Sequence, residues 1–257
     1  MSATTAPIAI QLYSVRDALQ QDFGGTIHKI AAMGYAGVET AGVFGGTPSD
    51  ATKLFSTLGL KVCSMHSALP LGDARNEVIE TAQALGTSYI VLPWLPPEQF
   101  ASVDLIKQSC ERLNEASTVA QQYGLTIGYH NHWFEPAPLG DSFGLEIMRQ
   151  HLDPAVIFEL DTYWIKAGGK DPAAVVKDFG TRAPLLHMKD GPGGSAVPGQ
   201  PMVALGEGAL DIPAIVNASG GNAQWLIVEL DQCATDMLEA VEKSYQYLVN
   251  KELGHGR

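Results

Sequence analysis

The sequence of 257 residues has few cysteines, no run of basic residues and no long apolar stretch. Its three cysteines, Cys63, Cys110 and Cys233, lie far apart and form no CxxC pair, which argues against a disulfide framework or a structural zinc site. With a net charge of -12 and no Lys/Arg run, the chain is a poor partner for nucleic acid. No apolar run approaches the ~18 to 20 residues that span a bilayer, so no membrane partner is expected.

The N-terminal residues MSATTAPIAIQLYS contain no basic stretch followed by an apolar one, so we expect no secretory signal. Together with the sparse, unpaired cysteines, this predicts a cytoplasmic protein with reduced thiols. The 46% of hydrophobic residues and 17% of charged residues are ordinary for a globular enzyme.

Short apolar runs alternate with longer helical patterns along the whole chain. Eight runs are predicted strands: 8–12, 36–39, 61–66, 89–93, 125–131, 156–161, 184–188 and 225–229. They start roughly 25 to 40 residues apart, which a strand, a helix and two loops require. The pattern predicts an α/β fold, a single-domain (β/α)8 TIM barrel over residues 1–257, because such barrels take about 250 residues. The alternative, an open doubly wound sheet, would normally carry a GxGxxG turn after the first strand, where this chain has QLYSVRD.

The helical patterns between these strands end where glycines follow them. One predicted helix covers 25–33 and ends at Gly34, and another covers 102–123 and ends at Gly124. A last helix is predicted over 233–250, lying against the barrel after the eighth strand.

The segment after the seventh strand is rich in Gly and Pro. The loop 190–208 is long for a barrel loop, so we interpret it as a candidate lid. Asp211, just after it, is predicted to cap the next helix.

Charged and imidazole side chains stand at the ends of three successive strands. Asp161, His187 and Glu229 end the sixth, seventh and eighth strands, where barrel enzymes place their chemistry. Such groups are costly to bury unless they are paired or bind a metal. This mixed set of oxygen and nitrogen donors suits Mn²⁺, Mg²⁺, Co²⁺ or Zn²⁺. The alternative is that they form salt bridges at the rim, with Lys189 or Arg16 as partners.

The fifth strand supplies further candidates. Period-two alternation places Gly128, His130 and His132 on one face. Glu135, three residues later, could fold back over the rim and supply a carboxylate. Spacing alone leaves open whether His130 or Glu135 is the fourth metal ligand. His130, His132 and Lys189 are the candidate catalytic residues, and Glu135 is a candidate base if it does not bind the metal.

Other polar and aromatic residues fall at strand ends and are candidate substrate contacts. They are Gln11, Glu39, His66 and Trp164, with Tyr13 and Trp94 also in reach of a central pocket. Each is equally compatible with packing at the rim or in the core.

These segments resemble the xylose isomerase-like TIM barrels, the sugar phosphate isomerase/epimerase family. The resemblance covers essentially the whole chain and is carried by QLYSVRD, GYAGVE, SMHS, GYHNHWFEP, LDTYW, HMKD, LGEGALD and VELD. It implies a divalent metal, usually manganese, held by strand-end Glu, Asp, His and Glu. Asp161, His187 and Glu229 match three of those positions, whereas His130 stands where many relatives have Glu.

The HNHxxE segment is similar to the branch of that family that acts on keto-sugars and keto-inositols. The resemblance implies a metal-dependent isomerase or epimerase that removes the proton α to a carbonyl through a metal-stabilised enediolate. The partner is then a small carbohydrate, and a homo-oligomer is compatible with the family. Elimination by a dehydratase or lyase is the nearest alternative. A sugar-binding barrel without turnover is the alternative outside enzymes, and an endonuclease is disfavoured by the acidic charge.

Overall fold

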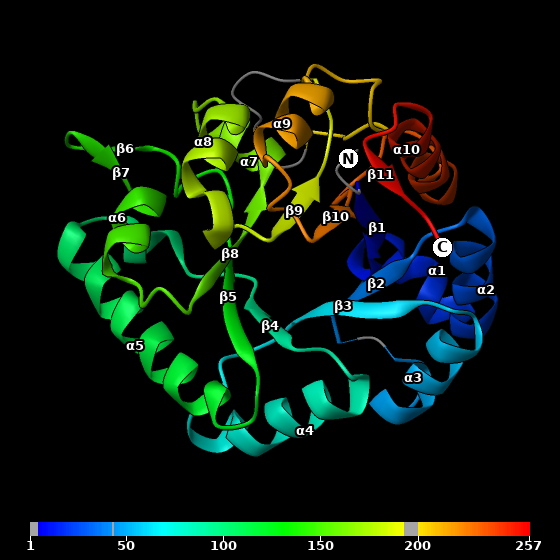
Figure 1. Ribbon diagram of the computed structural model, residues 1–257, viewed down its shortest axis with the longest axis horizontal. Helices are drawn as coiled ribbons and strands as arrows, with labels where there is room; N and C mark the ends of the chain where they lie inside the picture. The colour runs from blue at the N-terminus through cyan, green and yellow to red at the C-terminus, as the bar shows by residue number, and fades with distance from the viewer. Residues whose placement is uncertain (1–4, 43, 193–199) are drawn as a thin grey trace.

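The computed structural model describes residues 5–42, 44–192 and 200–257 and shows eight parallel strands closed into a barrel (Figure 1). The barrel strands are β1 (Ala6–Gln11), β2 (Gly37–Thr40), β3 (Lys61–His66), β4 (Tyr89–Leu92), β5 (Thr126–His130), β8 (Ile157–Asp161), β9 (Leu185–Met188) and β10 (Trp225–Val228). The last strand pairs with the first, with Ile10 opposite Val228, which closes the ring. The predicted barrel is confirmed, and each predicted strand lies within about two residues of its observed bounds.

Helices surround the barrel and cover the outer face of the sheet (Figure 1). They are α1 (Arg16–Gln21), α2 (Phe23–Met33), α3 (Pro48–Thr57), α4 (Arg75–Leu85), α5 (Val103–Gln121), α6 (Gly144–His151), α7 (Thr162–Ala167), α8 (Pro172–Phe179), α9 (Ile212–Ala218) and α10 (Met237–Asn250). None of these helices of the described residues is long and apolar enough to cross a membrane.

The helix boundaries follow from capping. Gly34 ends α2 with φ of 107°, a left-handed conformation that a glycine adopts without strain. Asp211 caps α9 as predicted, since its side chain accepts a hydrogen bond from the Ala214 amide. The last helix begins four residues later than predicted because Asp236 caps it through the Glu239 amide.

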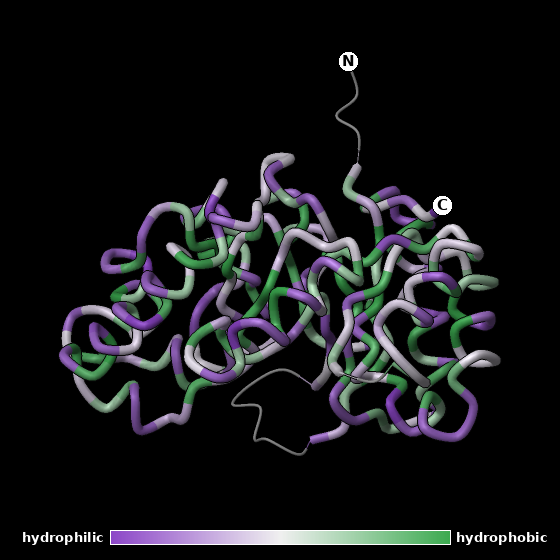
Figure 2. The backbone as a smooth tube through the Cα atoms, turned by 90° about the horizontal axis from the view of Figure 1, so that it is seen from below, coloured by the Kyte–Doolittle hydropathy of each residue, from purple (hydrophilic) through white to green (hydrophobic). Residues whose placement is uncertain are grey.

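The barrel interior changes from apolar to charged along the strand direction. Its lower part is a small apolar cluster of Ala9, Cys63, Val91, Leu185 and Ile227, separate from the main core between the sheet and the helices. Figure 2 shows hydrophobic segments running through the middle of the molecule and hydrophilic ones in the outer loops. Inward-facing residues recur every second position, and most strands lead from apolar residues to polar ones at the carboxyl end. β4, which continues into Pro93, is an exception.

Small residues make room for large ones at the bottom of the barrel. A Cβ atom on Gly37 would lie 2.9 Å from Trp225 Cζ3, and one on Gly128 would lie 2.8 Å from Ile157 Cδ1. These contacts explain the glycines in strands that otherwise favour β-branched residues.

Two short pairings complete the sheet structure. β6 (Pro138–Leu139) and β7 (Ser142–Phe143) form a small hairpin in the loop after β5. β11 (Gly254–His255) pairs with the start of β1 and fixes the C-terminus at the lower end of the barrel. The predicted lid over 190–208 falls in part on residues 193–199, which lie outside the described residues.

Candidate metal centre and substrate cavity

Four side chains converge at the carboxyl end of the barrel. His130, Asp161, His187 and Glu229 each offer one donor atom, and these atoms all lie within 4.8 Å of one another. All four residues are buried. The Nδ1 atom of His187 lies 2.7 Å from Glu229 Oε2, and His130 Nε2 lies 3.8 Å from Asp161 Oδ2.

The two oxygens of Asp161 have different surroundings. Oδ1 accepts a hydrogen bond from the Trp164 amide at the start of α7, which fixes the carboxylate. Within the described residues, Oδ2 is buried and accepts no hydrogen bond, although Lys189 Nζ forms an ion pair with it at 3.0 Å. Lys189 offsets part of the cost of burying this oxygen, and a bound divalent cation would add the close ligand contact that it lacks. Two imidazoles and two carboxylates are a donor set that Mn²⁺ and Zn²⁺ both accept, so these residues fit a divalent metal.

His130 is electrically neutral in this position. Burial, helped by the nearby His187, lowers the pKa of His130 to about 3. A neutral imidazole keeps a free lone pair on one ring nitrogen, which is the form that binds metals. The ring is therefore prepared for a ligand role.

Glu135 lies outside this set of four. Its Oε1 accepts a hydrogen bond from the Tyr129 hydroxyl at 2.6 Å, and its Oε2 accepts one from the His132 amide at 2.9 Å. Tyr129 points away from the barrel axis, on the face opposite His130. Glu135 is fully buried there, and burial raises its pKa to about 7. The geometry gives Glu135 a role in holding the loop after β5.

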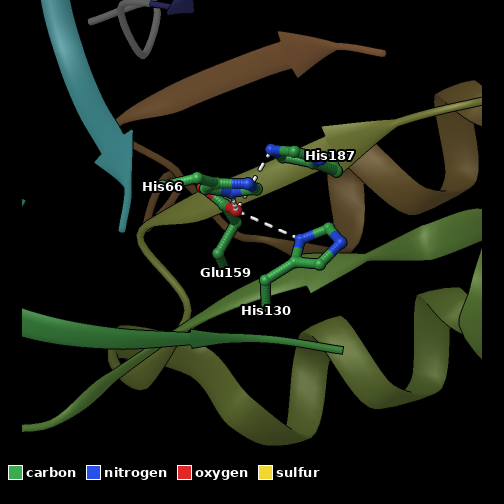
Figure 3. Close-up of side chains that lie close together, drawn as sticks. All are labelled: His66, His130, Glu159 and His187. Atoms are coloured by element: carbon green, nitrogen blue, oxygen red, sulfur yellow. Dashed lines mark hydrogen bonds and ion pairs between the residues drawn. The ribbon is translucent and has the colours of Figure 1, made fainter. Parts of the chain in front are cut away.

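A second layer of polar side chains lies one inward position below the four donors. Figure 3 shows three imidazoles converging on the carboxylate of Glu159. Glu159 Oε2 lies 2.6 Å from His66 Nε2, 3.1 Å from His130 Nδ1 and 3.1 Å from His187 Nε2. His130 Nε2 therefore faces Asp161 above the ring, and His130 Nδ1 faces Glu159 below it.

Glu39 joins this lower layer from β2. A register shift between Val38 and Glu39 places Glu39 opposite Ser64, whose hydroxyl donates to Glu39 Oε1 at 2.5 Å. The other oxygen, Oε2, accepts a hydrogen bond from Gln11 Nε2 at 2.6 Å and lies 2.7 Å from His187 Nε2. Burial and the neighbouring Glu159 raise the pKa of Glu39, because two buried carboxylates so close together disfavour double ionisation.

Lys189 lies among three carboxylates. Its Nζ atom is 3.0 Å from Asp161, 2.8 Å from Glu229 and 2.8 Å from Asp231. Burial opposes the charge on Lys189, but these carboxylates outweigh it and raise the pKa of the ammonium well above its ordinary value. The lysine therefore stays charged and balances part of the acidic site.

A cavity of about 340 Å³ opens above this centre. It is lined by Tyr13, Ala41, His66, Pro93, Trp94, His130, His132, Glu229 and Asp231. The His132 ring packs edge-on against Trp94 with centroids 4.5 Å apart, and its Nδ1 is buried with no hydrogen-bond partner in the part of the chain that the structure describes. Burial lowers the pKa of His132 to about 2, so this ring is neutral.

The predicted substrate contacts lie at different depths. His66 lines the cavity, whereas Gln11 and Glu39 are fully buried beneath it. Trp164 is also buried, with Lys189 Nζ 5.4 Å from the centre of its ring, and is not part of the cavity lining.

Two residues of the site were not assigned by sequence reasoning. Glu159 precedes Asp161 by two positions on β8, and Asp231 follows Glu229 by two positions after β10. Period-two spacing from an assigned residue is the signal that would have identified both.

The sequence matches the xylose isomerase-like TIM barrel family over residues 27–248. A sugar phosphate isomerase/epimerase from Parabacteroides distasonis ATCC 8503 has a similar structure, with a TM-score of 0.79 and 24% identity over 94% of this chain and 97% of that one. A second from the same organism gives a TM-score of 0.77 and 27% identity over 96% and 95%. The IOLI protein with a bound zinc atom gives a TM-score of 0.74 and 19% identity over 95% of this chain and 97% of that one. No curated protein matches the sequence.

Proposed function

The chain belongs to the xylose isomerase-like TIM barrel family, and we propose that it is a divalent-metal-dependent isomerase or epimerase of a sugar. The reaction would remove a proton next to a carbonyl group and return it at another carbon or face. The convergence of His130, Asp161, His187 and Glu229 below an open cavity is the observation that carries this proposal. Manganese is the first candidate metal, with magnesium, cobalt and zinc as alternatives.

The four converging side chains would hold the metal. A divalent cation bound there would supply Lewis acidity that makes a C–H beside a carbonyl easier to deprotonate. Asp161 is fixed by the Trp164 amide, and His130 and His187 are fixed by carboxylates below them. These contacts orient the donors before a ligand arrives.

Asp231 is the best-placed group to take the proton. Its carboxylate lines the cavity, and its Oδ2 lies 2.8 Å from Lys189 Nζ. The lysine fixes the orientation of this carboxylate and links it to Glu229, 2.8 Å from the same ammonium. His132, neutral and part of the cavity lining, is a further candidate to contact a substrate hydroxyl.

Exchange of substrate protons with solvent tests this proposal. The protein is dialysed against a chelator, loaded with Mn²⁺, and incubated in D₂O with a panel of ketoses and keto-sugars. We expect deuterium to enter the carbon next to the carbonyl, to depend on added Mn²⁺, and to fall at least about a hundredfold in Asp231→Asn. Exchange that persists at full rate after chelation contradicts the proposal.

Elimination is a second candidate because of the position of His66. Its ring lines the cavity, and its Nε2 lies 2.6 Å from Glu159 Oε2, a carboxylate that would stabilise a protonated ring. A donor there could protonate a leaving hydroxyl after the same proton abstraction, which gives a dehydratase. NMR analysis of the product separates the two reactions, since epimerisation loses no water.

A further inference from the structure

The walls of the substrate cavity carry two carboxylates, and the basic groups among the described lining residues are imidazoles. Glu229 and Asp231 are part of the lining, and no lysine or arginine of the described residues joins them there. The segments outside the described ranges, residues 1–4, 43 and 193–199, contain no lysine or arginine in the sequence. A lysine or arginine that binds an anionic ligand would therefore have to lie just outside the lining.

Lys189 lies directly below the cavity but its charge is already balanced. Its ammonium contacts the carboxylates of Asp161, Glu229 and Asp231, all within 3.0 Å. A divalent metal at the centre would bring two further positive charges beside Asp161 and Glu229, which would be among its donors, while Lys189 keeps its ion pair with Asp231. Neither cation is left unpaired to receive a phosphate dianion.

Arg16 is the other cation near the cavity mouth, and it is held away from the ligand space. Its guanidinium lies 4.1 Å from the centre of the Tyr13 ring and donates to the carbonyl oxygens of Tyr13 and Asp231. The adjoining cavity of about 570 Å³ contains Arg16 and Lys29. The aspartates lining that cavity outnumber the two cations: they are Asp17, Asp22, Asp231 and Asp236.

Aromatic surface takes the place of charge at the cavity mouth. Tyr13 is 45% exposed and Trp94 is 41% exposed, unusually high for large apolar side chains, and both line the cavity. Aromatic faces bind the C–H surface of a sugar ring, while imidazoles and carboxylates bind its hydroxyls. We infer that this site takes an uncharged, unphosphorylated sugar or polyol and excludes sugar phosphates. This inference rests on the proposed function and narrows its substrate class.

Matched pairs of ligands test the inference. The Mn²⁺-loaded protein is titrated with D-fructose and D-fructose 6-phosphate, and with two further ketoses and their phosphates. Binding is followed by saturation-transfer NMR, and proton exchange is followed in D₂O. For at least one pair we expect the free sugar to bind and exchange, with kcat/KM at least about tenfold higher than for its phosphate.

A designed cation provides the complementary measurement. Ala41 lines the cavity and is only partly buried, so Ala41→Arg adds a positive charge at the wall, and Ala41→Gln is the control for size. We expect Ala41→Arg to raise kcat/KM for the phosphate relative to the free sugar at least about fivefold. This effect should weaken at high salt. Ala41→Gln should leave this ratio unchanged.

The outcomes separate the two proposals. Exchange that is faster with sugar phosphates, and that is lost in Arg16→Gln, would overturn the inference while supporting the proposed function. Absence of both binding and exchange in every pair overturns both. A phosphate-to-sugar ratio in Ala41→Arg equal to that of Ala41→Gln also contradicts the inference, because the wall charge would then not control selectivity.

Discussion

His187 and Glu39 are joined by a buried contact of 2.7 Å between Nε2 and Oε2. The opposite ring nitrogen of His187 lies 2.7 Å from Glu229 in the candidate metal centre. One imidazole therefore connects the upper layer of donors to a lower layer of carboxylates. His130 repeats this arrangement, with Asp161 above its ring and Glu159 below. Carboxylates behind metal-binding histidines fix the orientation and tautomer of the ring.

The lower layer predicts that a carboxylate outside the four proposed donors controls metal affinity. Glu159→Gln removes the charged acceptor shared by His66, His130 and His187. We expect Mn²⁺ affinity to fall about 10- to 100-fold, as for other carboxylates behind metal ligands. Competition with a fluorescent chelator measures the affinity. The exposed Glu98→Gln is the control and should bind as the wild type does; equal affinity in Glu159→Gln would contradict the prediction.

The fourth ligand is tested by comparing one variant at the end of β5 with one in the loop after it. His130→Gln removes a donor from the candidate centre, so we expect Mn²⁺ affinity to fall by about a hundredfold or more. Glu135→Gln changes a carboxylate that bonds to Tyr129 and the His132 amide, so we expect a change below about threefold. The reverse order of the two effects would make Glu135 the ligand. Circular dichroism confirms that both variants are folded.

Glu135 also predicts how stability depends on pH. Burial raises its pKa to about 7 in the folded protein, above the ordinary 4.5 expected for the unfolded chain. A raised pKa means that the folded state binds the proton more tightly. The stabilisation is therefore complete below pH 4.5 and is lost as the pH rises through about 7.

Glu135→Gln resembles the protonated side chain and removes this dependence. The shift corresponds to about 3 kcal/mol, so the difference in unfolding free energy between wild type and Glu135→Gln should fall by roughly that amount between pH 4.5 and 8. Urea unfolding across this range measures it. A difference that stays constant, or that grows with pH, would show that the carboxyl is not titrating as described.

Asp190 joins the two ends of the segment predicted as a lid, residues 190–208. Its two oxygens accept hydrogen bonds from the amides of Gly191, Gly206, Gly208 and Leu210. Asp190→Asn replaces an acceptor by a donor facing these amides, so we expect a loss of about 2 to 3 kcal/mol in unfolding free energy. Hydrogen exchange should speed up at the Gly206 and Gly208 amides. If their protection is unchanged in Asp190→Asn, the carboxylate is not what holds this segment.

The architecture was predictable from the sequence because it depends on local signals. Eight apolar runs at regular spacing require eight parallel strands, and Gly34 and Asp211 mark helix ends by their own conformational and capping properties. The positions of Asp161, His187 and Glu229 followed from their places at the ends of predicted strands, because the carboxyl ends of barrel strands meet at one rim. The donor types themselves suggested a divalent metal there, and the resemblance to a known family added manganese as the usual one.

The roles of Glu135 and Glu159 depended on tertiary structure. Glu135 follows the strand by five residues, and only the path of the loop decides that it turns outward to Tyr129 rather than inward to the metal centre. Glu159 acquires its role from histidines on three other strands, which no local pattern brings together. The sequence by itself determined the barrel and the rim carboxylates, since both follow from strand periodicity. Which donors meet, and which charges around the cavity remain unpaired, was decided by the register and closure of the sheet.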